Sequence, residues 1–375
     1  METEFERMRI AIIGTRGIPA NYGGFETFAE ELSARLAERG HDVTVYGRSH
    51  YIDRAIKEHR GAKVRVLPGI THKYLDTPFN TLLASLDVMF RRYDILLYCN
   101  SANAFCTLFP RLTGKRIILN VDGLEWKRAK WNPFGQAVYK ISEFLSTIIP
   151  QVIVTDAVSV QEYYQQKFGC PSFYIPYGSA VSEVETQDVL KKFNVEKRKY
   201  ILYVSRLEPE NNAHVVIKAF EKVKTDMKLV IVGDAPYSDA YIKELKSTQD
   251  PRIIFTGYVF GSGYHEFQSN AYAYVQATEV GGTHPALVEG MGHGNCVIAN
   301  DVPEHREVVA DTGVYFTTQD ISSLTRQMEA LIANPEQVAM YRQRALERVA
   351  THYTWDAVTT AYEKLFRKVS GKRSE

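Results

Sequence analysis

The chain has 375 residues, of which 45% are hydrophobic and 24% charged, and this suits two globular domains of about 150–200 residues each. Lysine and arginine total 45 against 44 for aspartate and glutamate, so the net charge gives no reason to expect nucleic acid as a partner. The four cysteines form no Cys-x-x-Cys pair and no cluster with histidine, which argues against disulfides and zinc and favours the reducing cytoplasm.

Short apolar runs alternate with longer amphipathic stretches along the chain. In the first half, strands are expected at residues 9–13, 43–46, 63–67, 94–99, 116–121, 152–155 and 172–175. A helix is expected after the first strand, with one apolar stripe made of Phe25, Phe28, Ala29, Leu32 and Leu36. In the second half, strands are expected at residues 200–205, 229–232, 253–255, 273–276 and 296–299.

Apolar strands separated by helices are typical of parallel sheets buried on both faces, so we predict an α/β protein with two doubly wound, Rossmann-like domains. The polar, charged segment 178–198 separates them, which gives domains at 1–178 and 179–353. A C-terminal helix is expected at 354–370, with an apolar face that includes Trp355, Val358, Tyr362 and Leu365. Because such sheets bind ligands at the carboxyl ends of their strands, the two domains are expected to face a shared cleft.

The first candidate site is the glycine-rich segment after the first strand, GTRGIP at 14–19 and NYGGFE at 21–26. Gly23 and Gly24, just before a helix, let the backbone approach an anion or sugar hydroxyls at the helix N-terminus. The spacing differs from the Gly-x-Gly-x-x-Gly fingerprint of dinucleotide-binding folds. A long loop whose glycines only make turns is the alternative.

Two more candidates lie in the second half. The strand at 200–205 delivers Arg206 to its carboxyl end, where a guanidinium can bind a diphosphate; a surface salt bridge is the alternative. The segment EVGGTHPALVEGM at 279–291 opens a helix near Pro285, and its amides around 283–287 would point at a phosphate or sugar. Glu289, one turn into that helix, would accept hydrogen bonds from ribose or remain a surface carboxylate.

The order GGFE…RGHDVTV, IPYG, SRLEPEN, FTGYV and GGTHPALVEGM resembles the retaining glycosyltransferases of family 4, which have the GT-B fold, over residues 9–369. The opening IGTRGIPANYGGFET resembles the bacterial rhamnosyltransferase subgroup that builds polysaccharide repeat units on a lipid carrier. The resemblance also implies that the final helix crosses back onto the first domain.

The resemblance implies a retaining hexosyltransferase that moves L-rhamnose from dTDP-L-rhamnose onto a lipid-linked saccharide in bacterial cell-surface polysaccharide synthesis. The expected partners are a nucleotide sugar and this acceptor, with no cofactor and no metal, in the cytoplasm or on the inner face of the membrane. A UDP- or GDP-sugar donor remains an alternative within the same enzyme class. A nucleotide-sugar epimerase and a non-catalytic binding protein are the alternatives outside it.

Carried over by position, the resemblance gives catalytic roles to Asp122, Arg206 and His284. The donor-binding residues that it implies are Gly23, Gly24, Arg206, Asn211, Tyr258, Val259, Thr283, His284, Pro285, Ala286, Leu287 and Glu289. In that scheme Arg206 holds the diphosphate, Tyr258 and Val259 line the base pocket, and Glu289 holds the ribose. Two positions depart from the family pattern: Gly281 stands where the first glutamate of an E-x7-E pair is usual, and Asn211 replaces a phosphate-binding lysine.

A departing nucleoside diphosphate gathers negative charge, which enzymes stabilise with preplaced donors or a metal. The sequence contains no Asp-x-Asp, so Arg206 and the amides at 282–287 are the expected substitutes for a metal. A basic cluster at 127–131, followed by the apolar-rich stretch 134–149, is a candidate surface for anionic lipid. A solvated helix over the first sheet is the alternative for that stretch.

Overall fold

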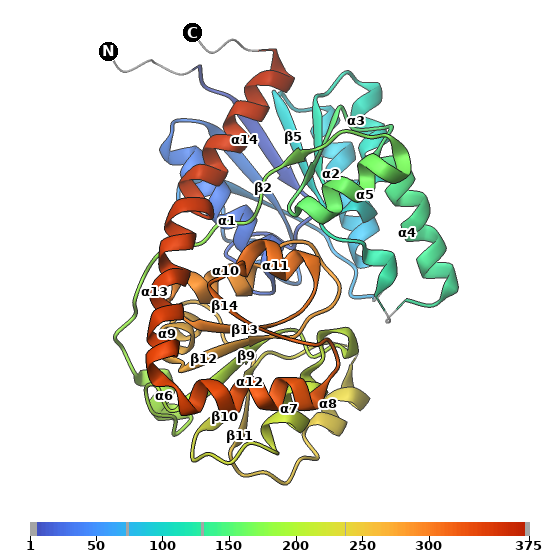
Figure 1. Cartoon of the computed structure of the whole chain (residues 1–375). Coiled ribbons are helices and arrows are strands. Elements are labelled where there is room, and N and C mark those ends of the chain that lie inside the picture. The colour runs from blue at the N-terminus through green and yellow to red at the C-terminus, as the bar shows by residue number, and fades with distance from the viewer. Residues whose placement is uncertain (1–5, 73–74, 129–130, 237, 372–375) are drawn as a thin grey trace. The chain divides into compact units, whose positions relative to one another are not determined.

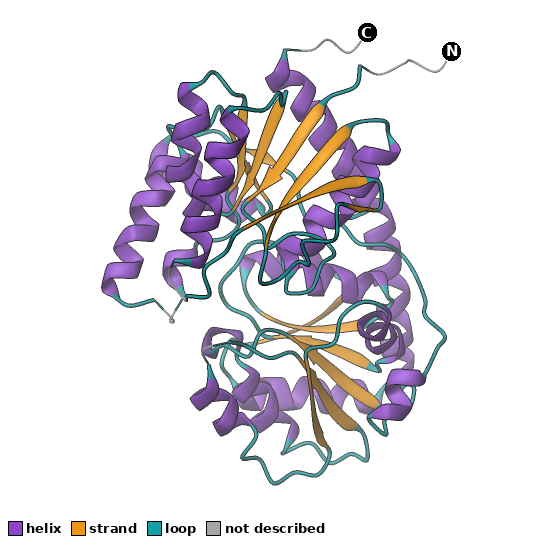
Figure 2. Cartoon of the chain, turned by 180° about the vertical axis from the view of Figure 1, so that it is seen from behind, coloured by secondary structure: helices purple, strands orange, loops and turns teal. Residues whose placement is uncertain are grey.

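The computed structural model describes residues 6–72, 75–128, 131–236 and 238–371, which divide into two compact units. Unit 1 comprises Met1–Trp126, Trp131–Tyr177 and Trp355–Glu375, and unit 2 comprises Lys127–Lys130 and Gly178–Thr354. The main division therefore falls between Tyr177 and Gly178, in the turn that precedes the polar segment. Each unit is a sheet with helices on both of its faces, as Figure 2 shows.

Unit 1 contains an eight-stranded sheet in the order β3-β4-β2-β1-β5-β6-β7-β8. All of its strand pairs are parallel except β3 with β4, and Ile10 of β1 lies opposite Val43 of β2 and Ile95 of β5. The strands are β1 (Arg9–Ile13), β2 (Asp42–Arg48), β3 (Glu58–His59), β4 (Ala62–Leu67), β5 (Ile95–Cys99), β6 (Ile117–Asn120), β7 (Val152–Thr155) and β8 (Phe173–Tyr174). The α-helices are α1 (Gly24–Glu38), α2 (Asp76–Met89), α3 (Leu108–Leu112), α4 (Pro133–Ser146), α5 (Val158–Phe168) and α14 (Trp355–Ser370), with 3-10 turns η1 (Ser101–Thr107) and η2 (Glu125–Lys127).

Unit 2 contains a six-stranded, all-parallel sheet in the order β11-β10-β9-β12-β13-β14. Its strands are β9 (Tyr200–Val204), β10 (Lys228–Val232), β11 (Ile253–Gly257), β12 (Ala273–Gln276), β13 (Cys296–Asn300) and β14 (Gly313–Phe316). Its helices are α6 (Asp188–Lys192), η3 (Pro209–Asn211), α7 (Ala213–Phe220), α8 (Asp239–Leu245), α9 (Ser262–Asn270), α10 (Pro285–Gly292), α11 (Pro303–Val309), α12 (Ile321–Ala333) and α13 (Pro335–His352). The predicted class, two doubly wound α/β units with mostly parallel sheets, is confirmed.

Two strands were missing from the sequence-based prediction. The first, β3, pairs with β4 through a tight turn in which Arg60 and Gly61 both have positive φ, and arginine is an unusual residue for that conformation. The second, β14, begins at Gly313. A Cβ at Gly313 would lie 2.7 Å from the carbonyl oxygen of Val297, so this glycine permits close strand pairing.

The last helix, α14, completes the core of unit 1. Its buried face includes the expected Trp355, Val358, Tyr362 and Leu365, together with Phe366. It packs against α1, where the Phe28 ring lies 5.3 Å from that of Tyr362, and the Asn120 amide donates to the Tyr362 hydroxyl at 2.9 Å. The amphipathic pattern thus lets a segment more than 300 residues away cover the sheet that begins at β1 (Figure 1).

Replacing Phe366 with alanine should lower the free energy of unfolding by roughly 3–5 kcal/mol, because this fully buried ring would leave a cavity between α14 and the sheet. Urea unfolding followed by circular dichroism measures the change. The matched control is Lys364→Ala on the exposed side of the same helix, which should stay within about 0.5 kcal/mol of the parent. An equally small effect at Phe366 would contradict this account of the core.

Candidate active site

The candidate residues of unit 2 gather at the carboxyl edge of its sheet, where β9 and β12 lie side by side although they are not consecutive in the chain. Parallel sheets bind ligands at such a point of reversed strand order. The loops after β9 and β10 touch there: Gly233 has φ +138, and a Cβ on it would lie 1.9 Å from the carbonyl oxygen of Ser205. Arg206, Tyr258 and His284 all follow strands that end at this edge.

Asn211 and Asn212 fix the loops on either side of that point. The Asn211 amide donates to the backbone carbonyl of Arg206 at 2.7 Å, and the Asn212 amide donates to the carbonyl of Ala277 at 2.9 Å and to Glu279 Oε1 at 2.7 Å. Both asparagines are buried. Asn211 is expected to contact the donor because it takes the place of a family lysine, and in the structure its amide holds the backbone next to Arg206.

Arg206 lies at the start of this loop with its side chain partly exposed. Its Nη1 is 3.7 Å from Glu208 Oε2, a distance that makes an ion pair without a hydrogen bond. The same carboxylate oxygen is 3.6 Å from Arg128 Nη1, and Arg128 is also 3.8 Å from Glu210. Arg128 is only 7% exposed, so the sequence-based expectation that it belongs to a lipid-facing cluster is wrong. Ala129 and Lys130 of that cluster lie outside the described residues.

His284 precedes the first residue of α10, Pro285, as the helix signal predicted. Its ring lies 4.9 Å from that of His305, whose Nδ1 is 3.1 Å from the carbonyl oxygen of Asn300. Burial lowers the pKa of His305 to about 4. Burial, followed by the neighbouring His305, holds the pKa of His284 well below its ordinary value. Both imidazoles are therefore neutral near pH 7, and sequence reasoning did not single out His305.

At Gly281, where the family pattern has a glutamate, the structure leaves no room for a side chain. A Cβ at Gly281 would lie 2.4 Å from His284 Cε1, so the imidazole fills the space that a side chain at 281 would enter. Glu279, two residues earlier, accepts hydrogen bonds from Asn212 and from Gln319 Nε2 at 2.8 Å. Its carboxylate therefore ties loops together within unit 2.

The N-terminus of α10 differs in one respect from the expectation. Leu287 has a fully buried side chain, and its amide donates to the carbonyl of His284 at 3.0 Å, so it closes the first helical turn. Pro285 has no N–H, which leaves the amides of Thr283, His284 and Ala286 as the candidate donors of the predicted stretch. Thr283 is buried, whereas Pro285 and Ala286 are half-buried.

Glu289, one turn into α10, is held by a residue that the sequence analysis missed. The hydroxyl of Tyr264, on α9, donates to Glu289 Oε2 at 2.5 Å, and Gln268 Nε2 donates to the same hydroxyl at 3.0 Å. Burial and the Glu289 charge hold the pKa of Tyr264 well above its ordinary value. Glu289 is thus an oriented, half-buried carboxylate, which matches neither a simple surface residue nor a buried structural ion pair.

Tyr258 and Val259 follow β11, and they behave differently. Tyr258 is exposed and its ring stacks on that of Phe260, with centroids 5.6 Å apart and planes inclined by 17°. Val259 packs partly buried against the core of unit 2. Phe260 was not predicted, although its position two residues after Tyr258 is the spacing that puts side chains on one face of an extended segment. Two exposed parallel rings offer a surface for a planar ligand.

Gly23, Gly24 and Asp122 belong to unit 1. Gly23 caps α1 in an extended conformation that any residue adopts, and its carbonyl accepts from the amides of Glu26 and Thr27. Asp122 follows β6 with φ +56, and its amide donates to Asn120 Oδ1 at 3.2 Å. All three residues follow strands that end at the carboxyl edge of this sheet. At this edge Gly14 has φ +98, and a Cβ on Gly14 would lie 2.6 Å from the carbonyl oxygen of Cys99.

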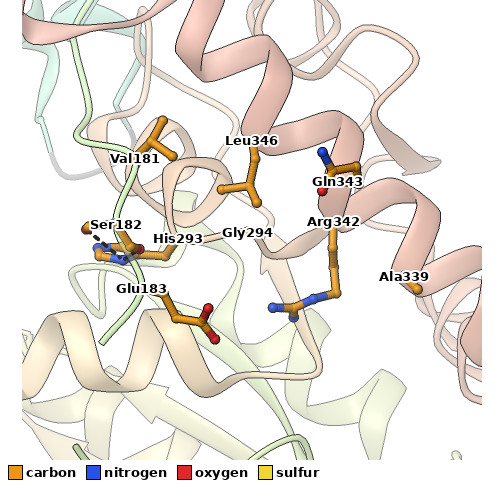
Figure 3. Close-up of a pocket in the computed structure, with 9 residues that line it drawn as sticks. All are labelled: Val181, Ser182, Glu183, His293, Gly294, Ala339, Arg342, Gln343 and Leu346. Carbon is orange, nitrogen blue, oxygen red and sulfur yellow. Dashed lines mark hydrogen bonds between the residues drawn. The ribbon is translucent and has the colours of Figure 1, made fainter. Parts of the chain in front are cut away.

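A pocket of about 360 Å³ lies elsewhere in unit 2, beyond the C-terminal end of α10. Figure 3 shows its lining, which comes from 181–183, His293, Gly294 and α13. His293 is bonded to Ser269 Oγ at 3.0 Å, to the carbonyl of Ser182 at 2.8 Å and to His265 at 3.0 Å. None of the predicted site residues lines this pocket. The ring nitrogens of His293 are engaged in the hydrogen bonds given above. Within the described ranges, no three His, Cys, Asp or Glu side chains gather as metal ligands would.

Acid should destabilise unit 2 in a window set by His305. Its pKa of about 4 in the folded protein lies below the ordinary 6.5, so the unfolded chain binds more protons between these values. The stabilisation is complete above about pH 6.5 and is lost as the pH falls towards 4, by about 3 kcal/mol in all. Denaturant unfolding at several pH values should show that the free energy of unfolding depends less steeply on pH in His305→Gln than in the parent. The exposed His352→Gln is the control, and equal slopes for parent and His305→Gln would refute the assignment.

Comparisons with known proteins show what each half of the chain is similar to. Residues 185–348 match the family model described as glycosyl transferases group 1, and residues 7–66 and 89–180 match a domain of unknown function, DUF1972. The O-antigen chain mannosyltransferase B of Escherichia coli is 24% identical over 200 residues, covering 52% of this chain and 51% of that protein. The phosphatidyl-myo-inositol mannosyltransferase of Mycolicibacterium smegmatis is 25% identical over 232 residues, covering 60% and 58%.

The chain thus spans about half the length of the curated relatives it matches. Among solved structures, Anabaena HepE in complex with UDP and glucose superposes with a TM-score of 0.79 at 15% identity, over 96% of this chain and all of that one. An identity this low shows the fold and nothing further. Residues 185–348 are therefore similar to the group 1 glycosyltransferases, and the chain has the GT-B fold.

Proposed function

We propose that this chain is a retaining hexosyltransferase that transfers a sugar from a nucleotide-sugar donor to a saccharide acceptor in polysaccharide synthesis. The observation that carries the proposal is the carboxyl edge of unit 2, where Arg206, the start of α10 and Glu289 lie around the point of reversed strand order. This edge falls within the matched glycosyltransferase domain. HepE, which shares the fold, is described as a complex with UDP and glucose.

In this proposal each part of the edge meets one part of the donor. The stacked rings of Tyr258 and Phe260 hold the base, and Glu289, oriented by Tyr264, accepts from the ribose hydroxyls. Arg206 and the amides at the start of α10 meet the diphosphate. His284 stands beside them as a neutral imidazole, which donates or accepts a hydrogen bond without adding charge.

The mechanism follows from where charge develops. As the bond to the leaving diphosphate breaks, negative charge grows on its oxygens, and the sugar becomes oxocarbenium-like. Arg206 is the cation that we assign to this charge, in place of a metal. Gly281 offers no carboxylate as a nucleophile, which fits same-face attack with retention, the leaving phosphate helping to deprotonate the acceptor. We further propose that Asp122 in unit 1 takes part in the transfer.

The finer assignment is L-rhamnose from dTDP-L-rhamnose, moved to a lipid-linked acceptor at the inner face of a membrane. The donor rests on the resemblance of residues 14–27 to the rhamnosyltransferase subgroup. The two curated relatives named above are mannosyltransferases, which keeps GDP- and UDP-sugars as the alternative donors. For the acceptor, one relative is named for phosphatidyl-myo-inositol, a lipid, and the other for an O-antigen chain.

The proposed class and donor are tested with a panel of dTDP-, UDP- and GDP-sugars. Calorimetry should show the tightest binding for dTDP-L-rhamnose, and turnover should persist in excess EDTA. Tighter binding of UDP-glucose or GDP-mannose would replace the donor and keep the class. Rescue by magnesium after loss in EDTA would refute metal independence. An epimerised sugar formed without acceptor, or binding with no turnover on any acceptor, would refute the transferase itself.

Arg206→Ala should lower kcat by roughly 10²–10³-fold, because one preorganised donor to the developing charge is lost. Arg206→Lys should recover only part, since an ammonium lacks the two-pronged geometry of the guanidinium. Asn211→Lys should also lower kcat, because it removes the amide that holds the Arg206 carbonyl. Exposed Arg326→Ala, in the same unit, is the control. If steady-state kinetics give Arg206→Ala a kcat within a few-fold of the parent's, the catalytic role is wrong and Arg206 only forms a surface ion pair.

A further inference from the structure

Helix α4 of unit 1 buries polar side chains and exposes apolar ones. Its buried residues are Ser142, Glu143 and Ser146, all of them polar. Most of its large apolar residues point outwards: Phe134 is 78% exposed, Ile141 is 60% exposed, and Val138 and Phe144 are about half exposed, while Leu145 packs partly buried against the core. A surface helix ordinarily turns its apolar stripe to the core and its polar residues to water, so α4 reverses the rule.

The polar side of α4 is fully used in packing. Ser142 Oγ donates to the carbonyls of Ser101 and Ala102 at 3.0 and 3.1 Å, which fixes α4 to η1. Glu143 accepts from the Tyr163 hydroxyl at 2.6 Å and from Lys167 at 2.9 Å, which fixes it to α5. Because these bonds set the rotation of the helix, the outward direction of its apolar residues is determined by the fold.

The exposed side is a continuous stripe, which we call the α4 stripe: Phe134, Val138, Ile141, Phe144 and, just past the helix, Ile148. The spacing keeps these side chains on one face over about four turns. Figures 1 and 2, seen from opposite sides, both place α4 at the outer rim of unit 1, beside α5. An exposed apolar band of this length on a folded protein marks a surface that another phase or molecule covers.

The charges around the stripe distinguish the occupants. Between residues 131 and 149 the charged residues are Lys140 and Glu143, and the carboxylate of Glu143 is buried against Lys167. Lys140 is exposed and its Nζ lies 4.8 Å from the centre of the Trp126 ring. The Trp131 and Tyr139 rings, 4.7 Å apart, add aromatic groups at the start of the helix. Apolar side chains with a flanking cation and indole rings match the boundary between lipid headgroups and acyl chains.

We propose that the α4 stripe docks unit 1 on an anionic lipid surface, with its apolar residues in the acyl boundary and Lys140 at the phosphates. This deepens the proposed function, since it rests on a lipid-linked acceptor, but lipid binding can be measured without turnover. The stretch 134–149 was part of the expected lipid surface, and the proposal keeps it while removing Arg128, which is buried. None of the helices in the described ranges has the length and apolar character to span a bilayer.

The test is co-sedimentation of the full chain with vesicles of phosphatidylglycerol and phosphatidylcholine. The double variant Phe134→Glu/Ile141→Glu should weaken binding at least tenfold, because each buried Ile or Phe contributes that much to partitioning. Lys140→Glu should weaken binding to the anionic vesicles and change little with pure phosphatidylcholine. Met340→Glu, an exposed apolar residue in unit 2, is the matched control and should bind as the parent does. Circular dichroism and the Tm check that each variant is folded.

Several results would overturn the proposal. One is a folded double variant that sediments like the parent. Another is a parent that ignores anionic vesicles and instead forms a dimer that the double variant loses, because the stripe would then cover a second copy. Hydrolysis of the donor is measured with the variants that no longer bind vesicles. This measurement separates the lipid-docking hypothesis from the transferase hypothesis. Vesicle binding without any turnover of nucleotide sugars would leave the docking surface standing and refute the transferase.

Discussion

The geometry of the candidate site depends on two adjacent asparagine amides. Asn211 holds the carbonyl of Arg206, and Asn212 holds the carbonyl of Ala277 and the carboxylate of Glu279. These bonds join the loop after β9 to the loop after β12, at the point where the order of strands reverses. A charge that acts on a transition state must be in place before the reaction, because moving it during the reaction costs free energy. The asparagines meet that requirement for Arg206 through the backbone.

The same edge keeps its positive charge on arginine. His284 lies close to Arg128 and Arg206 and beside His305, and burial keeps both imidazoles neutral. A second cation at His284 would be repelled by the arginines and would lose its hydration, so a neutral ring is the stable form. Gly281 belongs to the same arrangement, since the ring of His284 occupies the space beside it. The family glutamate and a histidine in this rotamer exclude each other sterically.

The sequence predicted what depends on local signals. Pro285 begins α10 as expected, and the stripe from Phe28 to Leu36 is buried in α1. The sequence-based prediction missed residues whose contacts join distant segments of the chain. Tyr264 reaches Glu289 from another helix, and His305 reaches His284 across 21 positions, so neither has a signal next to the motif that it supports. Leu287 was assigned to the ligand because its amide lies near the start of α10, yet that amide closes the first helical turn.

Helix α4 shows most sharply what a pattern leaves open. Its periodicity predicts one apolar and one polar face, but the pattern is the same whichever face is buried. The choice is made by partners elsewhere: the carbonyls of η1 accept from Ser142, and Tyr163 and Lys167 satisfy Glu143. Since a buried polar group without a partner is costly, these bonds make the reversed orientation stable. The apolar face is then left outwards by the same interactions that hold the helix, and its exposure is a property of the fold.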